Sequence, residues 1–339
     1  MTKKNKTIVR LVALAVLAAL GVWVVADNAN APYRKTEGKI FGTFYHITYR
    51  SSAILDTEVL DCLEKVDASM SAFNGNSIVS RVNRNERVAP DAMFRHVFAV
   101  AREVSEATDG SFDITVAPLV NLWGFGFKNS GAVTRPMIDS VIPFVGYRGV
   151  SIKGNSVVKD HPETMLDFSA IAKGYGCDVV AEMFERHGVE NYMIEIGGEI
   201  RARGLNPNQQ QWTLGIEKPI DDSLSQHHEL LAVLQKDRMA VATSGNYRNF
   251  YYKGGRKYAH TISPFTGCPV EHSLLSATVS APTCALADAY ATAFMVMGTQ
   301  KTIAFLSKHT DIEALLVYAD SLGNYHTWHS ESLSKFIEK

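Results

Sequence analysis

Cysteine is scarce in this sequence of 339 residues, which contains four cysteines. They stand at positions 62, 177, 268 and 284 and form no CxxC pair, so the usual pattern of a cysteine-based zinc site is missing. An excess of charge of one sign is also missing, because 34 basic residues nearly balance 35 acidic ones. This balance argues against a surface that binds nucleic acid.

Several common signatures of enzymes are absent. The sequence has no GxGxxG or GxxxxGK[ST] loop, which disfavours ordinary dinucleotide-binding and P-loop folds. It has no GxSxG elbow, which disfavours a Ser/His/Asp hydrolase. Hydrophobic residues make up 46% of the chain and aromatic residues 10%, so the chain can bury a sizeable core.

One long apolar run is present, at the N-terminus. Basic residues at positions 3, 4, 6 and 10 precede an uncharged stretch over residues 11–26. As a helix this stretch would be roughly 24 Å long, shorter than the ~30 Å hydrocarbon core of a bilayer. Residues 1–31 are therefore predicted to be an export signal peptide, cleaved after residue 31, or an uncleaved membrane anchor. An exported chain could form one or two disulfides, whose pairing stays open.

The hydrophobic periodicity predicts long helices alternating with many strands. Residues 32–37 read as a polar linker. We expect helices over residues 55–70, 91–108, 169–186 and 283–297. We expect strands over residues 39–49, 192–196, 212–217, 240–243, 276–281, 313–318 and 325–328, and a hairpin over 250–262 that turns at 254–255. This order predicts an α+β protein with mixed or antiparallel sheets flanked by helices.

One expected helix carries a candidate metal site. Asp288 and Thr292 are four residues apart and share a helical face with Ala291. A carboxylate with further oxygen ligands suits Mg²⁺ that shares its coordination with substrate phosphates. The alternative is a buried aspartate that only bonds a neighbouring helix end.

Two further segments could act on a phosphate-containing substrate. Residues 167–174 place an acid, a hydroxyl and small residues at a helix start, where free N–H groups bind anions and Lys173 could add a charge. Ser169 as a simple N-cap and Lys173 as a solvated side chain explain the same residues. His260, at the end of an expected strand, could remove a proton from an attacking hydroxyl, or serve only as a structural hydrogen-bonding group.

Taken together, and in this order, these motifs resemble those of the FAD:protein FMN transferases, the ApbE-like flavin transferases. The resemblance extends from Gly38 to the end of the chain. The matching segments are residues 70–73, 108–115, 118–126, 167–174, 197–199, 244–248 and 287–288. Several such segments in register make a coincidence remote.

The resemblance implies a T-fold-like core and a single catalytic domain over residues 38–339. It implies Mg²⁺-dependent transfer of FMN from FAD to a Ser or Thr hydroxyl, which forms a phosphoester and releases AMP. The acceptor would be an exported or membrane-bound redox protein, such as a membrane electron-transport subunit. The protein would then work on the periplasmic side of the inner membrane, soluble or N-terminally anchored. The alternatives are a Mg²⁺-dependent FAD pyrophosphatase that yields FMN and AMP, and a non-catalytic flavin-binding protein.

The resemblance also implies roles for single residues. His260 would lie near the acceptor hydroxyl as the catalytic base. Mg²⁺ would be held by Asp288 and Thr292, with backbone oxygens from Ala170 and Ala291. The flavin nucleotide would contact Phe41, Phe73, Ser111, Phe112, Asp113, Asp167, Lys173 and Ile262.

The sequence departs from the family pattern at three of its positions. Ser263 replaces the aspartate that commonly follows the histidine motif, so any role of that acid is absent or moved. Phe41 stands where methionine is frequent, and Ala291 stands where some relatives have an acid. A metal site of this composition would depend more on backbone oxygens and on the phosphates of FAD.

Overall fold

The protein is built around one large sheet, seen in a computed structural model that describes residues 10, 31–124, 133–218, 230–245, 250–253, 256–259 and 261–338. Among these residues every strand pairing is antiparallel. The expected α+β class is confirmed, with antiparallel rather than mixed sheets. The eight strands of the large sheet lie in the order β1 (Tyr33–Ile40), β2 (Thr43–Arg50), β5 (Tyr192–Ile196), β6 (Glu199–Arg203), β9 (Arg238–Gly245), β12 (Leu274–Ser280), β13 (Glu313–Ala319) and β14 (Tyr325–His329).

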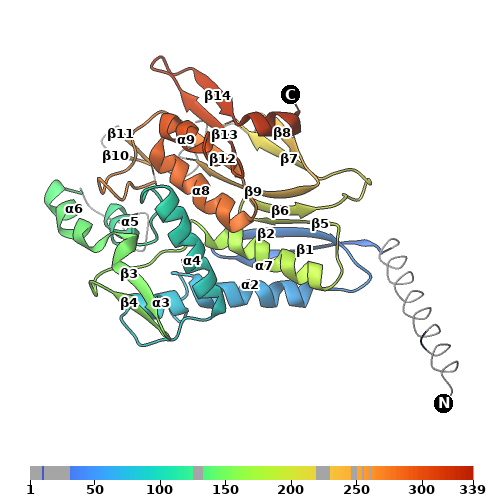
Figure 1. The fold of residues 1–339 in the computed structure, drawn as a ribbon, viewed down its shortest axis with the longest axis horizontal. Coiled ribbons are helices and arrows are strands. Elements are labelled where there is room, and N and C mark those ends of the chain that lie inside the picture. The colour runs from blue at the N-terminus through green and yellow to red at the C-terminus, as the bar shows by residue number, and fades with distance from the viewer. Residues whose placement is uncertain are drawn as a thin grey trace.

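Helices pack on one face of this sheet (Figure 1). The helices are α2 (Asp56–Met70), α3 (Ile78–Asn83), α4 (Ala92–Ala107), α5 (Ala117–Trp123), α6 (Arg135–Val141), α7 (Ala172–Arg186), α8 (Cys284–Met297) and α9 (Thr299–Leu306). Three short 3-10 turns are also present, over Ile142–Phe144, Tyr147–Gly149 and Glu331–Phe336.

Three small sheets complete the described structure. The first contains β7 (Thr213–Glu217), β8 (Leu230–Gln235) and β15 (Ile337–Glu338) and covers part of the second face of the large sheet. The other two are hairpins, β3 (Val150–Lys153) with β4 (Ser156–Lys159) and β10 (Phe250–Lys253) with β11 (Arg256–Ala259).

The large sheet is buried on both faces where the small sheet covers it. Along β13, Ala314 and Leu316 belong to the core beneath the helices, whereas Leu315 and Val317 belong to the core beneath β7 and β8. Successive side chains of a strand point to opposite faces, so a strand between two cores needs apolar residues at every position. This requirement explains the continuous apolar sequence of β13.

Helices α7 and α8 cross closely, and their contact fixes the start of α8. A Cβ atom added to Gly174 would lie 2.2 Å from the carbonyl oxygen of Cys284, so only glycine fits at the crossing. Four residues further along α7, buried Asp178 accepts hydrogen bonds from the N–H groups of Cys284 (2.9 Å) and Ala285 (2.8 Å). These two N–H groups have no partner within α8, so the carboxylate stabilises the helix end.

The N-terminal part of the sheet differs from the sequence prediction. The single strand expected over residues 39–49 is a hairpin that turns at Phe41 and Gly42, both with positive φ. The prediction of a linker over residues 32–37 is wrong for residues 33–37, because these residues belong to β1 and pair with β2. The charged side chains that looked like a linker are typical of an edge strand, whose outer face meets water.

The third helix starts later than predicted. Asp167 Oδ1 accepts the N–H of Ser169 (2.8 Å), which makes a tight turn, and α7 begins only at Ala172. Ser169 is therefore not the N-cap. The hairpin predicted over residues 250–262 is confirmed for β10 and β11, while its turn lies outside the described residues.

The remaining expectations concern cysteines, membranes and charge. All four cysteines are free thiols, and the buried thiols of Cys177 and Cys284 lie against backbone carbonyls of β6 and β9. The predicted signal peptide or anchor falls almost wholly outside the described residues, and within the described part of the chain no helix has the length and apolar character needed to cross a membrane.

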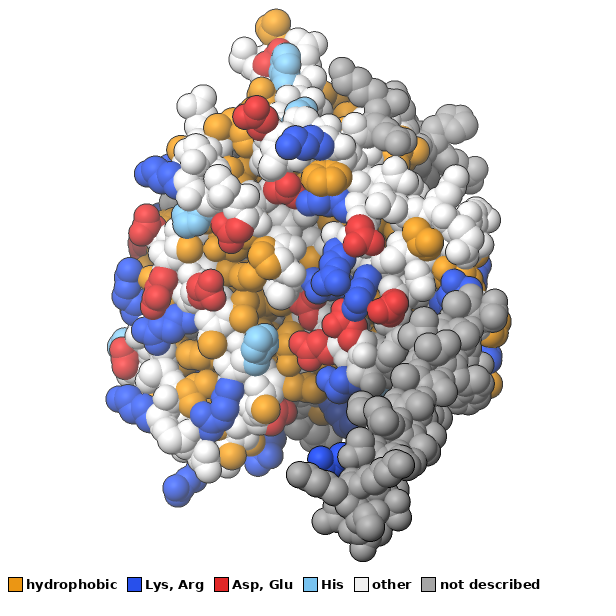
Figure 2. Space-filling model, turned by 45° about the vertical axis from the view of Figure 1, so that its right-hand side comes forward, with side chains coloured by type: hydrophobic (Ala, Val, Ile, Leu, Met, Phe, Trp, Pro, Cys, Tyr) orange, Lys and Arg blue, Asp and Glu red, His pale blue; other side chains and the backbone are white. Residues whose placement is uncertain are grey.

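Figure 2 shows basic and acidic side chains interspersed on the face that it draws, without a patch of one sign.

Replacing the carboxylate that holds the start of α8 should destabilise the fold. We expect Asp178→Ala to lower the free energy of unfolding by about 2 kcal/mol, because two buried N–H groups lose their acceptor. Asp178→Asn keeps one acceptor oxygen and should lose less. Urea unfolding measures the free energy of unfolding of both variants. Asp61→Ala, on the exposed face of α2, is the control. Equal stability of the alanine variant and the unsubstituted protein would contradict this role.

Candidate functional site

A cavity of about 780 Å³ opens beside the crossing of α7 and α8. Its wall combines loops with the ends of β9 and α8, and its volume lies in the range of sites that enclose a small molecule or cofactor. Most of the predicted site residues line this cavity. These are Phe73, Ser111, Phe112, Asp113, Asp167, Ala170, Lys173, Ile262, Asp288 and Thr292.

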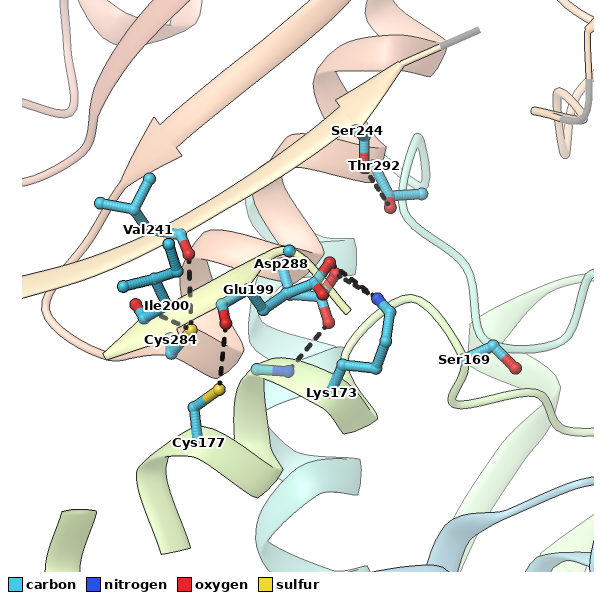
Figure 3. A network of polar contacts seen from close by, with 12 residues as sticks. Ser169, Lys173, Cys177, Glu199, Ile200, Val241, Ser244, Cys284, Asp288 and Thr292 are labelled. Atoms are coloured by element: carbon cyan, nitrogen blue, oxygen red, sulfur yellow. Dashed lines mark hydrogen bonds and ion pairs between the residues drawn. The ribbon is translucent and has the colours of Figure 1, made fainter. Parts of the chain in front are cut away.

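Three charged side chains meet at one side of the cavity (Figure 3). The ammonium Nζ of Lys173, on α7, lies 2.7 Å from Glu199 Oε1 and 3.7 Å from Asp288 Oδ1. The second oxygen of Asp288 accepts the backbone N–H of Gly174 at 3.1 Å. These three residues come from α7, β6 and α8, so their meeting depends on the helix crossing described above.

Burial and mutual attraction act in opposite directions in this cluster. Glu199 and Asp288 are 4% and 2% exposed, and burial raises the pKa of each carboxyl group above its ordinary value, while the Lys173 ammonium opposes the rise. Burial would lower the pKa of Lys173, but the two carboxylates raise it. Two carboxylates thus face one ammonium, and the fully ionised cluster holds an excess of one negative charge. Such a site favours a further cation.

Hydroxyl groups continue this wall of the cavity. Thr292 lies one helical turn beyond Asp288 on α8, as the spacing predicted, and its Oγ1 is 3.2 Å from Ser244 Oγ on β9. Both hydroxyls line the cavity. The arrangement offers carboxylate and hydroxyl oxygens on one surface, which are ligands that Mg²⁺ accepts.

Two predicted aspartates hold the loops on the opposite side of the cavity. Asp113 accepts hydrogen bonds from the N–H (2.7 Å) and hydroxyl (2.6 Å) of Thr115 and from the N–H of Tyr147 (2.8 Å). Burial raises the pKa of Asp113, and these hydrogen bonds oppose the rise. Asp167 donates its backbone N–H to the carbonyl of Ile114 (2.7 Å), which ties the two lining loops together.

Two predicted residues that the structure describes, Phe41 and Ala291, are not among those that line the cavity. Phe41 is partly buried against the cores beneath α7, and its ring lies 2.9 Å from a Cβ built on Gly176. Ala291 is fully buried next to Thr292. His260 lies outside the described residues, although Thr261 and Ile262, which follow it in the sequence, line the cavity.

Glu199 is the site residue that the sequence did not reveal. It ends the segment 197–199 that matches the family motifs, and the positive φ values of Gly197 and Gly198 form the β5–β6 turn before it. One signal in the sequence could have identified Glu199. It is a charged residue that stands directly after this turn, at the start of a strand that enters the core.

Ser263, the departure from the family pattern, belongs to a turn beside the cavity. Its N–H donates to the carbonyl of Cys268 (2.9 Å), and its carbonyl accepts from the N–H of Gly267 (2.9 Å). Its hydroxyl accepts the N–H of Thr266 at 3.4 Å. Ser263 therefore serves the backbone of the loop that contains Pro264, which lines the cavity.

Known proteins resemble this chain over most of its length. An FAD:protein FMN transferase from Vibrio cholerae serotype O1 is 37% identical, over 95% of this chain and 99% of the relative. An Escherichia coli K12 protein of the same name is 31% identical, over 96% of this chain and 97% of the relative.

Solved structures agree with the sequence matches. The flavin transferase ApbE from Vibrio cholerae superimposes with a TM-score of 0.82 at 35% identity, over 90% of this chain and 99% of that chain. The flavinyl transferase ApbE from Pseudomonas stutzeri gives a TM-score of 0.80 at 30% identity, over 90% and 97% of the two chains. The sequence profile of the ApbE family matches residues 41–316. The chain is therefore a member of the ApbE family, as its motifs predicted.

Proposed function

We propose that this protein is an FAD:protein FMN transferase that moves FMN from FAD to a Ser or Thr hydroxyl of a protein acceptor. The product would be a phosphoester-linked flavin, and AMP would leave. The observation that carries this proposal is the charged cluster of Lys173, Glu199 and Asp288 at the wall of a cofactor-sized cavity. The names of the relatives support the same reaction.

The oxygen ligands on α8 fit a magnesium ion. Asp288 and Thr292 would hold it with their side chains, and Ala170 and Ala291 with backbone oxygens. This donor set consists of carboxylate, hydroxyl and backbone oxygens, which favours Mg²⁺ over zinc. When bound, Mg²⁺ would neutralise charge on the pyrophosphate and on the departing AMP.

The chain's own residues would bind and orient FAD. Lys173, whose side chain is 26% exposed, would direct its ammonium at the pyrophosphate. Phe73 and Phe112 line the cavity and would contact the flat rings of the nucleotide. The remaining contacts proposed from the family motifs are Phe41, Ser111, Asp113, Asp167 and Ile262.

The transfer itself would break the phosphoanhydride bond of FAD and form a phosphoester bond to the acceptor. The acceptor hydroxyl oxygen would attack the phosphorus of the FMN half of FAD. The bond from that phosphorus to the bridging oxygen would break, and AMP would leave with the electron pair. His260 would accept the proton of the attacking hydroxyl. Positioning and charge neutralisation provide most of the catalysis in such reactions.

The acceptor and the location are part of the same proposal. Residues 1–31 would export the chain as a signal peptide or anchor it, and residues 38–339 would form the catalytic domain. The acceptor would then be an exported or membrane-bound redox protein, met on the periplasmic side of the inner membrane.

Intact mass measures the proposed reaction directly. The full-length protein, FAD and Mg²⁺ are incubated with a candidate acceptor domain that carries a Ser or Thr flavinylation site. We expect the acceptor to gain the mass of one FMN less one water, and EDTA to abolish the gain. FMN and AMP in solution without labelled acceptor would indicate a pyrophosphatase instead. Bound, unreacted FAD with every acceptor tried would indicate a flavin-binding protein.

Removing the carboxylate on α8 should abolish transfer. We expect Asp288→Ala to lose at least about 10²-fold in rate, because the ion loses its charged side-chain ligand. Asp139→Ala, at an exposed position of α6, removes the same charge far from these ligands in the sequence and serves as the control. Transfer at the unsubstituted rate in Asp288→Ala would exclude Asp288 as a ligand.

The proposed base is tested separately from FAD binding. We expect His260→Gln to reduce the turnover rate by about 10²-fold or more, because the attacking hydroxyl keeps its proton. FAD binding, followed by flavin fluorescence, should change little. His187→Gln, at the exposed end of α7, is the matched control. A variant that loses FAD affinity and keeps its turnover rate would assign His260 to binding rather than to proton transfer.

A further inference from the structure

Glu199 is a buried carboxylate with one oxygen left unpaired. It begins β6, directly after the Gly197–Gly198 turn, and its side chain lines the cavity. Oε1 accepts a hydrogen bond from Lys173, whereas buried Oε2 has no hydrogen-bond partner among the described residues. Burying a carboxylate in this way is unfavourable, so its presence calls for a role beyond packing.

The position of the Lys173 ammonium indicates that role. It lies 2.7 Å from Glu199, within hydrogen-bond distance, but 3.7 Å from Asp288 Oδ1, which is too long for a hydrogen bond. Glu199 thus holds the ammonium, and Asp288 Oδ1 accepts no hydrogen bond from it. The other oxygen of Asp288 is occupied by the N–H of Gly174. Oδ1 is therefore the oxygen that remains for a cation.

We propose that Glu199 is a positioning residue that holds the Lys173 ammonium in its own hydrogen bond, so that Lys173 stays in a longer ion pair with Asp288, at 3.7 Å, and Asp288 Oδ1 stays open to the metal ion. This inference rests on the magnesium site of the proposed function. Without the charge of Glu199, the nearest carboxylate for the Lys173 ammonium is Asp288. A direct hydrogen bond from Lys173 to Asp288 Oδ1 would compete with the metal for the same oxygen.

Metal affinity, rather than activity, tests this inference. Mn²⁺, which also prefers oxygen ligands, is titrated into the full-length protein with FAD present and no acceptor, and free Mn²⁺ is followed by electron paramagnetic resonance. We expect Glu199→Gln, which has nearly the same shape, to weaken Mn²⁺ binding about tenfold or more. Glu190→Gln, whose exposed side chain carries the same charge on the loop before β5, should bind like the unsubstituted protein.

A double substitution separates an effect through Lys173 from a direct effect of the Glu199 charge. At an FAD concentration that saturates each variant, Lys173→Met removes the competitor and should bind Mn²⁺ at least as tightly as the unsubstituted protein. Adding Glu199→Gln to Lys173→Met should then change the affinity little. An equal loss from Glu199→Gln in both backgrounds would overturn the inference, because the carboxylate would act on the ion directly. Thermal unfolding of each variant verifies that it is folded.

The remaining outcomes keep this inference distinct from the proposed function. Unchanged Mn²⁺ affinity in Glu199→Gln would overturn the inference while leaving FMN transfer intact. Failure of the unsubstituted protein to bind Mn²⁺ would overturn it as well. In both cases the gain of acceptor mass described above decides separately whether the protein transfers FMN.

Discussion

The close crossing of α7 and α8 is the contact on which the rest of the site depends. Glycine at position 174 lets the α7 backbone approach the start of α8, and Asp178 then bonds the first two N–H groups of α8. The same approach brings Lys173 on α7 beside Asp288 on α8. Stability and site geometry therefore come from one contact, and a residue larger than glycine at position 174 would disturb both.

The charge at this crossing explains why the site suits both a metal and a phosphate. When fully ionised, the two buried carboxylates and one ammonium carry an excess negative charge, which attracts a divalent cation. Once the cation is added, the total charge becomes positive and favours a pyrophosphate. Glu199 contributes to this balance twice, because it supplies one of the negative charges and also sets the position of the ammonium. In the proposed function, the cluster would therefore serve a bound ion and its substrate together.

The sequence predicted the parts of the site that lie within one element. Asp288 and Thr292 could be placed on one helical face because their spacing matches one turn of α8. Periodicity likewise gave α2, α4 and α8 nearly to the residue. The motifs of the family predicted Ser111, Asp113 and Asp167 as contacts of the flavin nucleotide, and all three line the cavity.

What the sequence could not predict depends on contacts between elements. Glu199 follows two glycines and looks like part of a turn, since nothing in its neighbourhood shows that Lys173 lies across from it. The resemblance assigned Phe41 to the flavin, yet its ring packs beneath α7, next to the turn at positions 41 and 42. Strand β1 has an edge strand's charged sequence, which resembles a linker until its pairing with β2 is known.

A crystal structure of the protein with FAD and Mn²⁺ tests the central claim, that this cavity is the nucleotide and metal site, most directly. Anomalous scattering from manganese locates the ion without ambiguity. The account predicts a peak bonded to Asp288 Oδ1 and Thr292 Oγ1, with Lys173 still on Glu199 and the FAD pyrophosphate beside the ion. A manganese peak elsewhere, or flavin bound outside the cavity, would contradict it.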